Sequence, residues 1–157
     1  MDPDGLSPID VHDDDVFDAL YREHFPALVR VAFLITGSHE TAEDAVHDTF
    51  LRCRVRLADL DHPRSYLRAA VVNECRSVHR RAQRERCDRP VDVLLPVELV
   101  ELRDALARLP WRQRAAIVLR YFADVPDDEI ARTLGCRPST VRSHIRRGIA
   151  KLKEVLT

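Results

Sequence analysis

Apolar residues recur every three or four positions along almost the whole chain, and this spacing most constrains the fold. The first two runs are Val16, Leu20, Leu28, Val31 and Ile35, then Ala42, Ala45, Val46, Phe50, Cys53 and Leu57. Such spacing puts the side chains on one face of a helix, whereas a half-buried strand needs strict alternation, for which there is no convincing run. The chain also has only four Gly. It is therefore predicted to be all-α.

Capping and helix-breaking residues divide this pattern into helices. The first is predicted to start at Asp14 or Asp15, with an interruption near Pro26, because proline removes a backbone donor from a helix interior. Gly37 is expected to end it, and Ser38 to cap a helix that reaches about Ala58. A third helix is predicted from Pro63, since proline suits the first turn.

The composition changes after Arg81. Residues 82–97 are polar, include two prolines and have no helical period, which is typical of a linker. Helical spacing then resumes up to Pro110 and over about Trp111–Phe122, and two short helices follow, split at 135–138. The predicted organisation is an acidic disordered tail at 1–13, two small helical domains at 14–81 and 98–157, and a flexible linker at 82–97.

A net charge of −1 hides a segregation of charge along the 157 residues. Residues 1–15 contain six Asp and no Lys or Arg, so the remaining residues carry a net charge of +5. Residues 137–153 contain six basic residues and no acidic one. Basic patches of this kind are expected of nucleic-acid-binding proteins, although a solvated helix face can have the same composition.

Residues 127–145 have the pattern of a helix-turn-helix unit. Gly135 supplies the turn, and Ala131 is small enough for two helices to cross closely. Ser139 or Thr140 is expected to cap the second helix and leave backbone N–H groups free for a phosphate. Opposite its apolar side, this helix carries hydroxyls and arginines suited to the major groove. The predicted duplex-binding residues are Ser139, Thr140, Arg142, Ser143, Arg146 and Arg147.

Two sets of motifs resemble the bacterial sigma factors. Leu109-Pro110 with Arg114, Leu119–Phe122, Glu129–Ala131 and Thr140–Ser143 resemble sigma region 4. Ala42–Leu51 is similar to the polymerase-binding helix of region 2, and Pro63–Leu67 with Asn73 and Arg80-Arg81 is similar to its promoter-melting helix. The resemblance spans about Phe17–Leu156 and leaves no room for regions 1 or 3, so the chain resembles the extracytoplasmic-function (ECF) subfamily. It departs from the family pattern at His47, Arg54, Tyr66 and Ser77.

The resemblance implies a sigma factor, which binds core RNA polymerase and directs promoter recognition and melting without enzymatic activity. Region 2 would dock on the clamp helices of the largest polymerase subunit through Asp44, Asp48, Phe50 and Arg52, although Phe50 can equally be a core residue. The residues expected at the opened -10 element are Asp61, His62, Arg64, Tyr66, Asn73, Arg76, Arg80 and Arg81. Region 4 would bind the -35 duplex and the polymerase flap. An anti-sigma factor is the other expected partner.

Other functions stay open at this point. A helix-turn-helix regulator of the response-regulator output type explains residues 98–157 equally well, but it needs a receiver or ligand domain in front. Cys75 and His79, four residues apart, could share a metal with Cys53 or Cys87, as in a metal- or redox-sensing protein. Without CxxC spacing or a second close pair, neither a metal nor a cofactor is expected. The N-terminus has no signal-peptide pattern and no run spans a bilayer, so the protein is expected in the cytoplasm.

Overall fold

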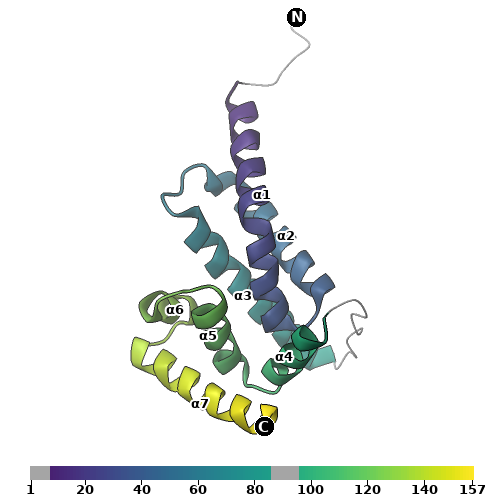
Figure 1. Cartoon of the computed structure of the whole chain (residues 1–157). Helices are drawn as coiled ribbons and strands as arrows, with labels where there is room; N and C mark the ends of the chain where they lie inside the picture. The colour runs from purple at the N-terminus through teal and green to yellow at the C-terminus, as the bar shows by residue number, and fades with distance from the viewer. Residues whose placement is uncertain (1–7, 86–95) are drawn as a thin grey trace, which may run out of the picture.

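The computed structural model describes residues 8–85 and 96–157, and this part of the chain is entirely helical, with seven helices and no strand (Figure 1). Helices α1–α3 form the first unit, and helices α4–α7 form the second. The helices are α1 (Pro8–Thr36), α2 (His39–Leu57), α3 (Pro63–Glu85), α4 (Val97–Ala107), α5 (Trp111–Phe122), α6 (Asp127–Leu134) and α7 (Pro138–Leu156). The all-α prediction is confirmed.

Helix α1 differs from its prediction at two places. It begins at Pro8, six residues before Asp14, so residues 8–13 are helical and not part of a disordered tail, while residues 1–7 lie outside the described residues. The fixed φ of proline suits this first turn. The helix also continues through Pro26, whose side chain is exposed. Packing of α1 against both α2 and α3 offsets the one backbone hydrogen bond that proline removes.

Three of the residues predicted at helix ends agree with the structure. Gly37 ends α1 with φ of 80°, and the Ser38 hydroxyl accepts a hydrogen bond from the Thr41 N–H at 3.3 Å. Gly135 ends α6 in the left-handed region, with φ of 67°. The cap of α7 was predicted wrongly, because its N-cap is Arg137 and no side chain caps it. Pro138 at the first helical position sets this start earlier than Ser139.

The ends of the predicted linker are helical. Helix α3 runs four residues past Arg81 to Glu85, and α4 starts at Val97. Residues 86–95, which include Cys87, lie outside the described residues. The rest of the predicted linker lies in that gap, apart from Pro96, which precedes α4.

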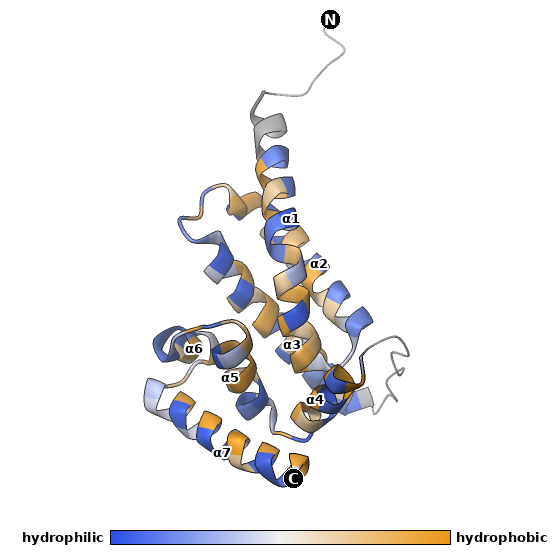
Figure 2. Ribbon diagram, in the orientation of Figure 1, coloured by the Kyte–Doolittle hydropathy of each residue, from blue (hydrophilic) through white to orange (hydrophobic). Residues whose placement is uncertain are grey.

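The two units pack against each other and share one apolar core (Figure 1). In the first unit Phe50, Leu67 and Val71 are fully buried, and in the second Leu106 and Ile130 are. Helix α1 contacts α4 and α5, and α3 contacts α6. Figure 2 shows the apolar residues of α7 along the side turned toward α5, with polar residues on the opposite side.

Arg114 joins the units through hydrogen bonds. Its side chain is only 5% exposed and donates to the Ile35 carbonyl, at the end of α1, at 2.7 Å. It also donates to the Leu109 carbonyl at 3.0 Å and the Ala107 carbonyl at 3.3 Å. A guanidinium has enough donors to serve three carbonyls at once. Arg114 therefore fixes the end of α4 against the end of α1.

Candidate nucleic-acid interface

Helix α7 is held against α5 along one side, and this leaves its basic side free. Val141 and Gly148 are buried in this contact. A Cβ at Gly148 would lie 2.5 Å from Cδ1 of Ile117, so the two helices approach closely only because position 148 has no side chain. On the outer side Ser139, Arg142, Arg146 and Arg147 are exposed, and Thr140 and Ser143 are half-buried. All six predicted duplex-binding residues thus lie on α7, and four of them are open to solvent.

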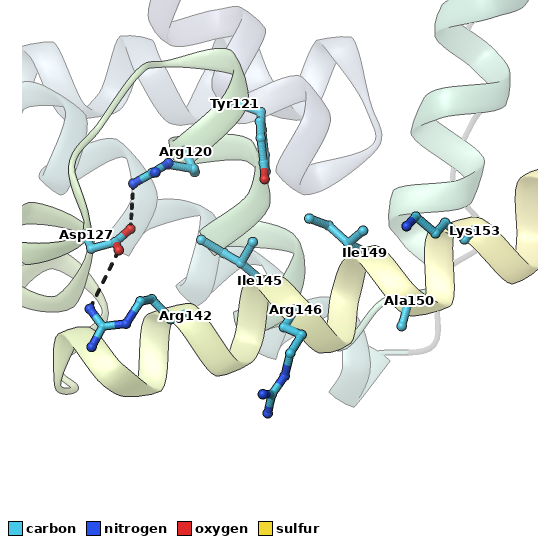
Figure 3. A pocket seen from close by; sticks show the side chains of 9 residues that line it. All are labelled: Arg120, Tyr121, Asp127, Arg142, Ile145, Arg146, Ile149, Ala150 and Lys153. Carbon is cyan, nitrogen blue, oxygen red and sulfur yellow. Dashed lines mark hydrogen bonds and ion pairs between the residues drawn. The ribbon is translucent and has the colours of Figure 1, made fainter.

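A cleft of about 530 Å³ runs along α7 beside α5 (Figure 3). Asp127 lies at one end, where Arg120 contacts its carboxylate at 2.8 Å and Arg142 does so at 3.8 Å. Arg146 points away from Asp127, on the open side of the helix (Figure 3). The cleft therefore has an orienting carboxylate at one end and cations along it. Arg120 and Lys153 line it too, and sequence reasoning missed both.

The positive charge of this surface affects His144. Partial burial, then the charges of Arg112 and Arg147, lower the pKa of the His144 imidazole below its ordinary value. The imidazole is therefore neutral at pH 7, and the charge of the α7 surface comes from arginine and lysine.

Helix α3 carries most of the residues predicted to bind the opened strand. Asn73, Arg80 and Arg81 are exposed along it, Tyr66 is half-buried, and Asp61, His62 and Arg64 are exposed at its start. Tyr66 and Asn73 line a polar cleft of about 430 Å³ between α2 and α3. Helical spacing places Tyr66, Asn73 and Arg80 along one face of α3. The structure brings these predicted residues together on one basic helix and the loop before it.

Arg76 is the exception among them, because the second unit covers it. Its guanidinium lies over the Trp111 ring, 5.1 Å from the centroid, and donates to the Leu134 carbonyl at 3.4 Å. Burial, then the charges of Arg112 and Arg80, lower the pKa of Arg76. In this arrangement Arg76 is a contact between the units.

An ion pair that sequence reasoning missed lies beside this face. Arg68 of α3 donates to the Glu129 carboxylate of α6 at 2.6 Å, across 61 positions of sequence. No short-range pattern links two such residues. The only feature of the sequence that could have predicted this pair is the opposite charge of the two residues.

The predicted polymerase-binding residues lie on α2, with one correction. Asp44, Asp48 and Arg52 are exposed, and Arg52 pairs with Glu74 of α3 at 2.8 Å. Phe50 was predicted wrongly as a contact, because its ring is fully buried and packs edge-on against Phe17 and Tyr21.

The same side of α2 exposes apolar residues that sequence reasoning did not select. Leu51 is 50% exposed and Val55 is 87% exposed. Asp44, Asp48, Leu51 and Val55 follow one another at helical spacing, so they form one exposed stripe, which we call the α2 stripe. A stripe of acids and apolar residues is suited to a protein partner rather than to DNA.

Cys53 and Cys75 are buried, unreactive thiols. Burial, then the neighbouring charge of Glu74, raises the pKa of the Cys75 thiol to about 12, and burial raises that of Cys53. A buried thiol that resists deprotonation is a poor nucleophile. Among residues 8–85 and 96–157, no three His, Cys, Asp or Glu side chains are grouped to hold a metal. Cys87 lies outside them.

Comparison with known proteins defines the class of this chain. The family model of Sigma-70 region 2 matches residues 20–85, and that of Sigma-70 region 4 matches residues 99–152. Region 2 stands where a response regulator would need a receiver domain. The two matches therefore support a sigma factor and not a regulator of the response-regulator output type.

Relatives and solved structures identify the subfamily of sigma factors to which the chain is similar. SigM of Mycobacterium tuberculosis, an ECF RNA polymerase sigma factor, is 32% identical over 151 residues, which are 89% of this chain and 76% of SigM. The structure of the sigma factor RpoE with the anti-sigma factor NepR, from Bartonella quintana, has a TM-score of 0.74 at 25% identity and covers 89% of this chain and 96% of that one. CnrH with the cytosolic domain of CnrY has a TM-score of 0.69 at 29% identity, over 89% of this chain and 86% of that one.

The chain belongs to the ECF sigma factors. It is a sigma factor that binds core RNA polymerase and directs promoter recognition and transcription initiation. Sigma factors are regulatory proteins. Of the helices described, none is both long and apolar enough to cross a membrane.

Proposed function

We propose that each unit of this sigma factor binds a different part of the promoter, and that α7 reads the -35 duplex. The observation that carries this assignment is the free basic side of α7, where Arg142, Arg146 and Arg147 are exposed. Arginine contacts phosphates and guanine edges in the major groove. Ser139, Thr140 and Ser143 supply hydroxyls near the start of the helix, where short donors reach the DNA backbone.

In this proposal, the face of α3 that carries Tyr66, Asn73 and Arg80 binds the opened -10 strand. Tyr66 supplies an aromatic ring for stacking, and Asn73 an amide for a base edge. Arg80 and Arg81, with Arg64 at the other end of the helix, follow the phosphates, and Asp61 and His62 lie in the loop before α3. Strand separation then uses captured bases and polymerase binding energy, so the protein needs no enzymatic activity.

The α2 stripe and the flanking Arg52 bind the polymerase clamp helices in this proposal, and the second unit meets the flap. Exposed carboxylates at Asp44 and Asp48 beside exposed Leu51 and Val55 fit a protein surface that is both basic and apolar. The units serving these roles are residues 14–81 and 98–157. We further propose a cytoplasmic location, where polymerase and DNA are, and control by an anti-sigma factor, as in the complexes of RpoE and CnrH.

Replacing Arg146 tests the assignment of the -35 element. Arg146→Ala is expected to weaken promoter binding by the holoenzyme about tenfold, because one specific arginine contact is worth about 1–3 kcal/mol. Binding of core polymerase should not change. Arg22→Ala, which removes an exposed arginine from α1, is the matched control. Promoter binding is measured by footprinting and core binding by gel filtration. Loss of core binding in Arg146→Ala would refute the domain assignment.

A further inference from the structure

The acidic first turn of α6 lies against the face of α3 to which the opened strand is assigned. Glu129 accepts a hydrogen bond from Arg68 at 2.6 Å, and both side chains are mostly buried, at 22% and 12% exposed. Burial alone would raise the pKa of the Glu129 carboxyl, but hydrogen bonds from Arg68 and Ser65 and the charges of Arg68 and Arg132 lower it. Glu129 is thus an ionised carboxylate held by the Arg68 guanidinium, and Ser65 lines the same cleft.

The surroundings of Glu129 include residues assigned to the DNA strand. A cleft of about 410 Å³ separates α3 from α6. His62, Tyr66 and Asn73 line its α3 wall, and Glu129 and Arg132 line its α6 wall. Tyr66 and Asn73 line the α2–α3 cleft as well, so a DNA strand that contacts both of them runs along the edge of α3 that α6 covers here. Ser65 lines this cleft too, and the Arg68 guanidinium is bonded to Glu129 on its α6 wall, so a phosphate that takes the place of Glu129 would lie close to both.

Arg68 and Ser65 have the chemistry of a phosphate site. A guanidinium beside a hydroxyl is a common donor set for DNA phosphates. A carboxylate fits the same donors, with one negative charge and two acceptor oxygens. We infer that Arg68 and Ser65 form a backbone-phosphate site for the opened strand, and that Glu129 occupies this site in the free chain. The inference rests on the proposed function of α3.

Glu129 can occupy the phosphate site only in the free chain, where the two units are in contact. The -10 and -35 elements are about 25 base pairs, or about 85 Å, apart along duplex DNA. A compact chain of this length has a radius of gyration of only about 15 Å. Since α3 and α6 are in contact here, the units must separate before α3 and α7 reach both elements. Separation withdraws Glu129 and exposes Arg68.

A pair of neighbouring substitutions tests the site. Glu129→Gln removes the charge that competes with DNA, while Asp128→Asn makes the same change on an exposed side chain of the same turn. The free proteins are titrated into a fluorescein-labelled single-stranded DNA of mixed sequence at low salt, and anisotropy is recorded. Glu129→Gln should bind about tenfold tighter than the wild type, equivalent to ~1.4 kcal/mol. Asp128→Asn should stay within about twofold of the wild type, as expected of one screened surface charge.

Two further measurements separate the site from a general charge effect. Adding Arg68→Gln to Glu129→Gln should abolish the gain in affinity, since it removes the phosphate ligand. Trp111, the only tryptophan, lies under Arg76 between the units, so its emission reports their separation. Glu129→Gln should shift this emission to the red, and Asp128→Asn should not. Circular dichroism checks that each variant is folded.

Several outcomes would overturn the inference. Equal gains in Glu129→Gln and Asp128→Asn would mean that any lost negative charge has the same effect. No gain in either, or a gain that survives Arg68→Gln, would mean that Glu129 does not occupy a phosphate site. Transcription with core polymerase tests the proposed function separately, because in the open holoenzyme Glu129→Gln and the wild type should initiate equally. Absence of initiation by both would refute the function and not the occupancy of the site.

Discussion

At the residue scale, the stability of this fold depends on a few buried polar side chains. Arg114 is the largest of them, and its donors serve the carbonyls of Ile35, Leu109 and Ala107. The Ile35 and Ala107 carbonyls lie in the last turns of α1 and α4, where helix carbonyls lack intrahelical donors, and the Leu109 carbonyl lies in the turn between α4 and α5. A charged side chain in an apolar core is tolerated when several acceptors satisfy it.

Substitution of Arg114 is expected to destabilise both units together. Arg114→Ala leaves buried carbonyls without donors and opens a cavity, so the free energy of unfolding should fall by about 2–4 kcal/mol. Arg114→Lys should lose less, because an ammonium keeps the charge but reaches fewer of the carbonyls. Urea unfolding followed by circular dichroism measures both. An Arg114→Lys variant as stable as the wild type would show that the hydrogen-bond geometry of the guanidinium contributes nothing.

At the scale of helices, the apolar spacing predicted the helices well, and the bounds of α5 agree with the predicted Trp111–Phe122. The tolerance of glycine for positive φ also correctly predicted helix ends at Gly37 and Gly135. The error at Pro26 has a tertiary cause: proline was predicted to interrupt the helix, but packing against α2 and α3 keeps α1 continuous. Phe50 was placed at the surface by resemblance, whereas its periodicity already put it on the buried stripe with Val46 and Cys53.

The crossing of α5 and α7 gives a prediction at this scale. Gly148→Val adds a branched side chain where even a Cβ would lie 2.5 Å from Ile117 Cδ1, and should cost about 1–3 kcal/mol of stability through overpacking. Ala150→Val makes a similar change on an exposed position of the same helix and controls for helix propensity. Thermal unfolding compares them. Equal melting temperatures would contradict the close contact.

At the scale of the whole molecule, the sequence predicted two helical units but not their contact. Arg68 and Glu129 are 61 positions apart, and Arg76 meets Trp111 across the same boundary. Periodicity describes which face of a helix is buried but not which other helix buries it. The same contact covers part of the surface assigned to the -10 strand, so the free chain and the promoter-bound chain must differ in arrangement.

Transcription reconstituted from purified components tests the central claim most directly. The purified chain is added to bacterial core RNA polymerase on genomic DNA of its own source, and the 5′ ends of the transcripts are sequenced. We predict transcripts that start at a limited set of positions, share upstream -35 and -10 sequences, and are absent when the chain is omitted. A chain that binds core polymerase or DNA but yields no specific start sites would contradict the account.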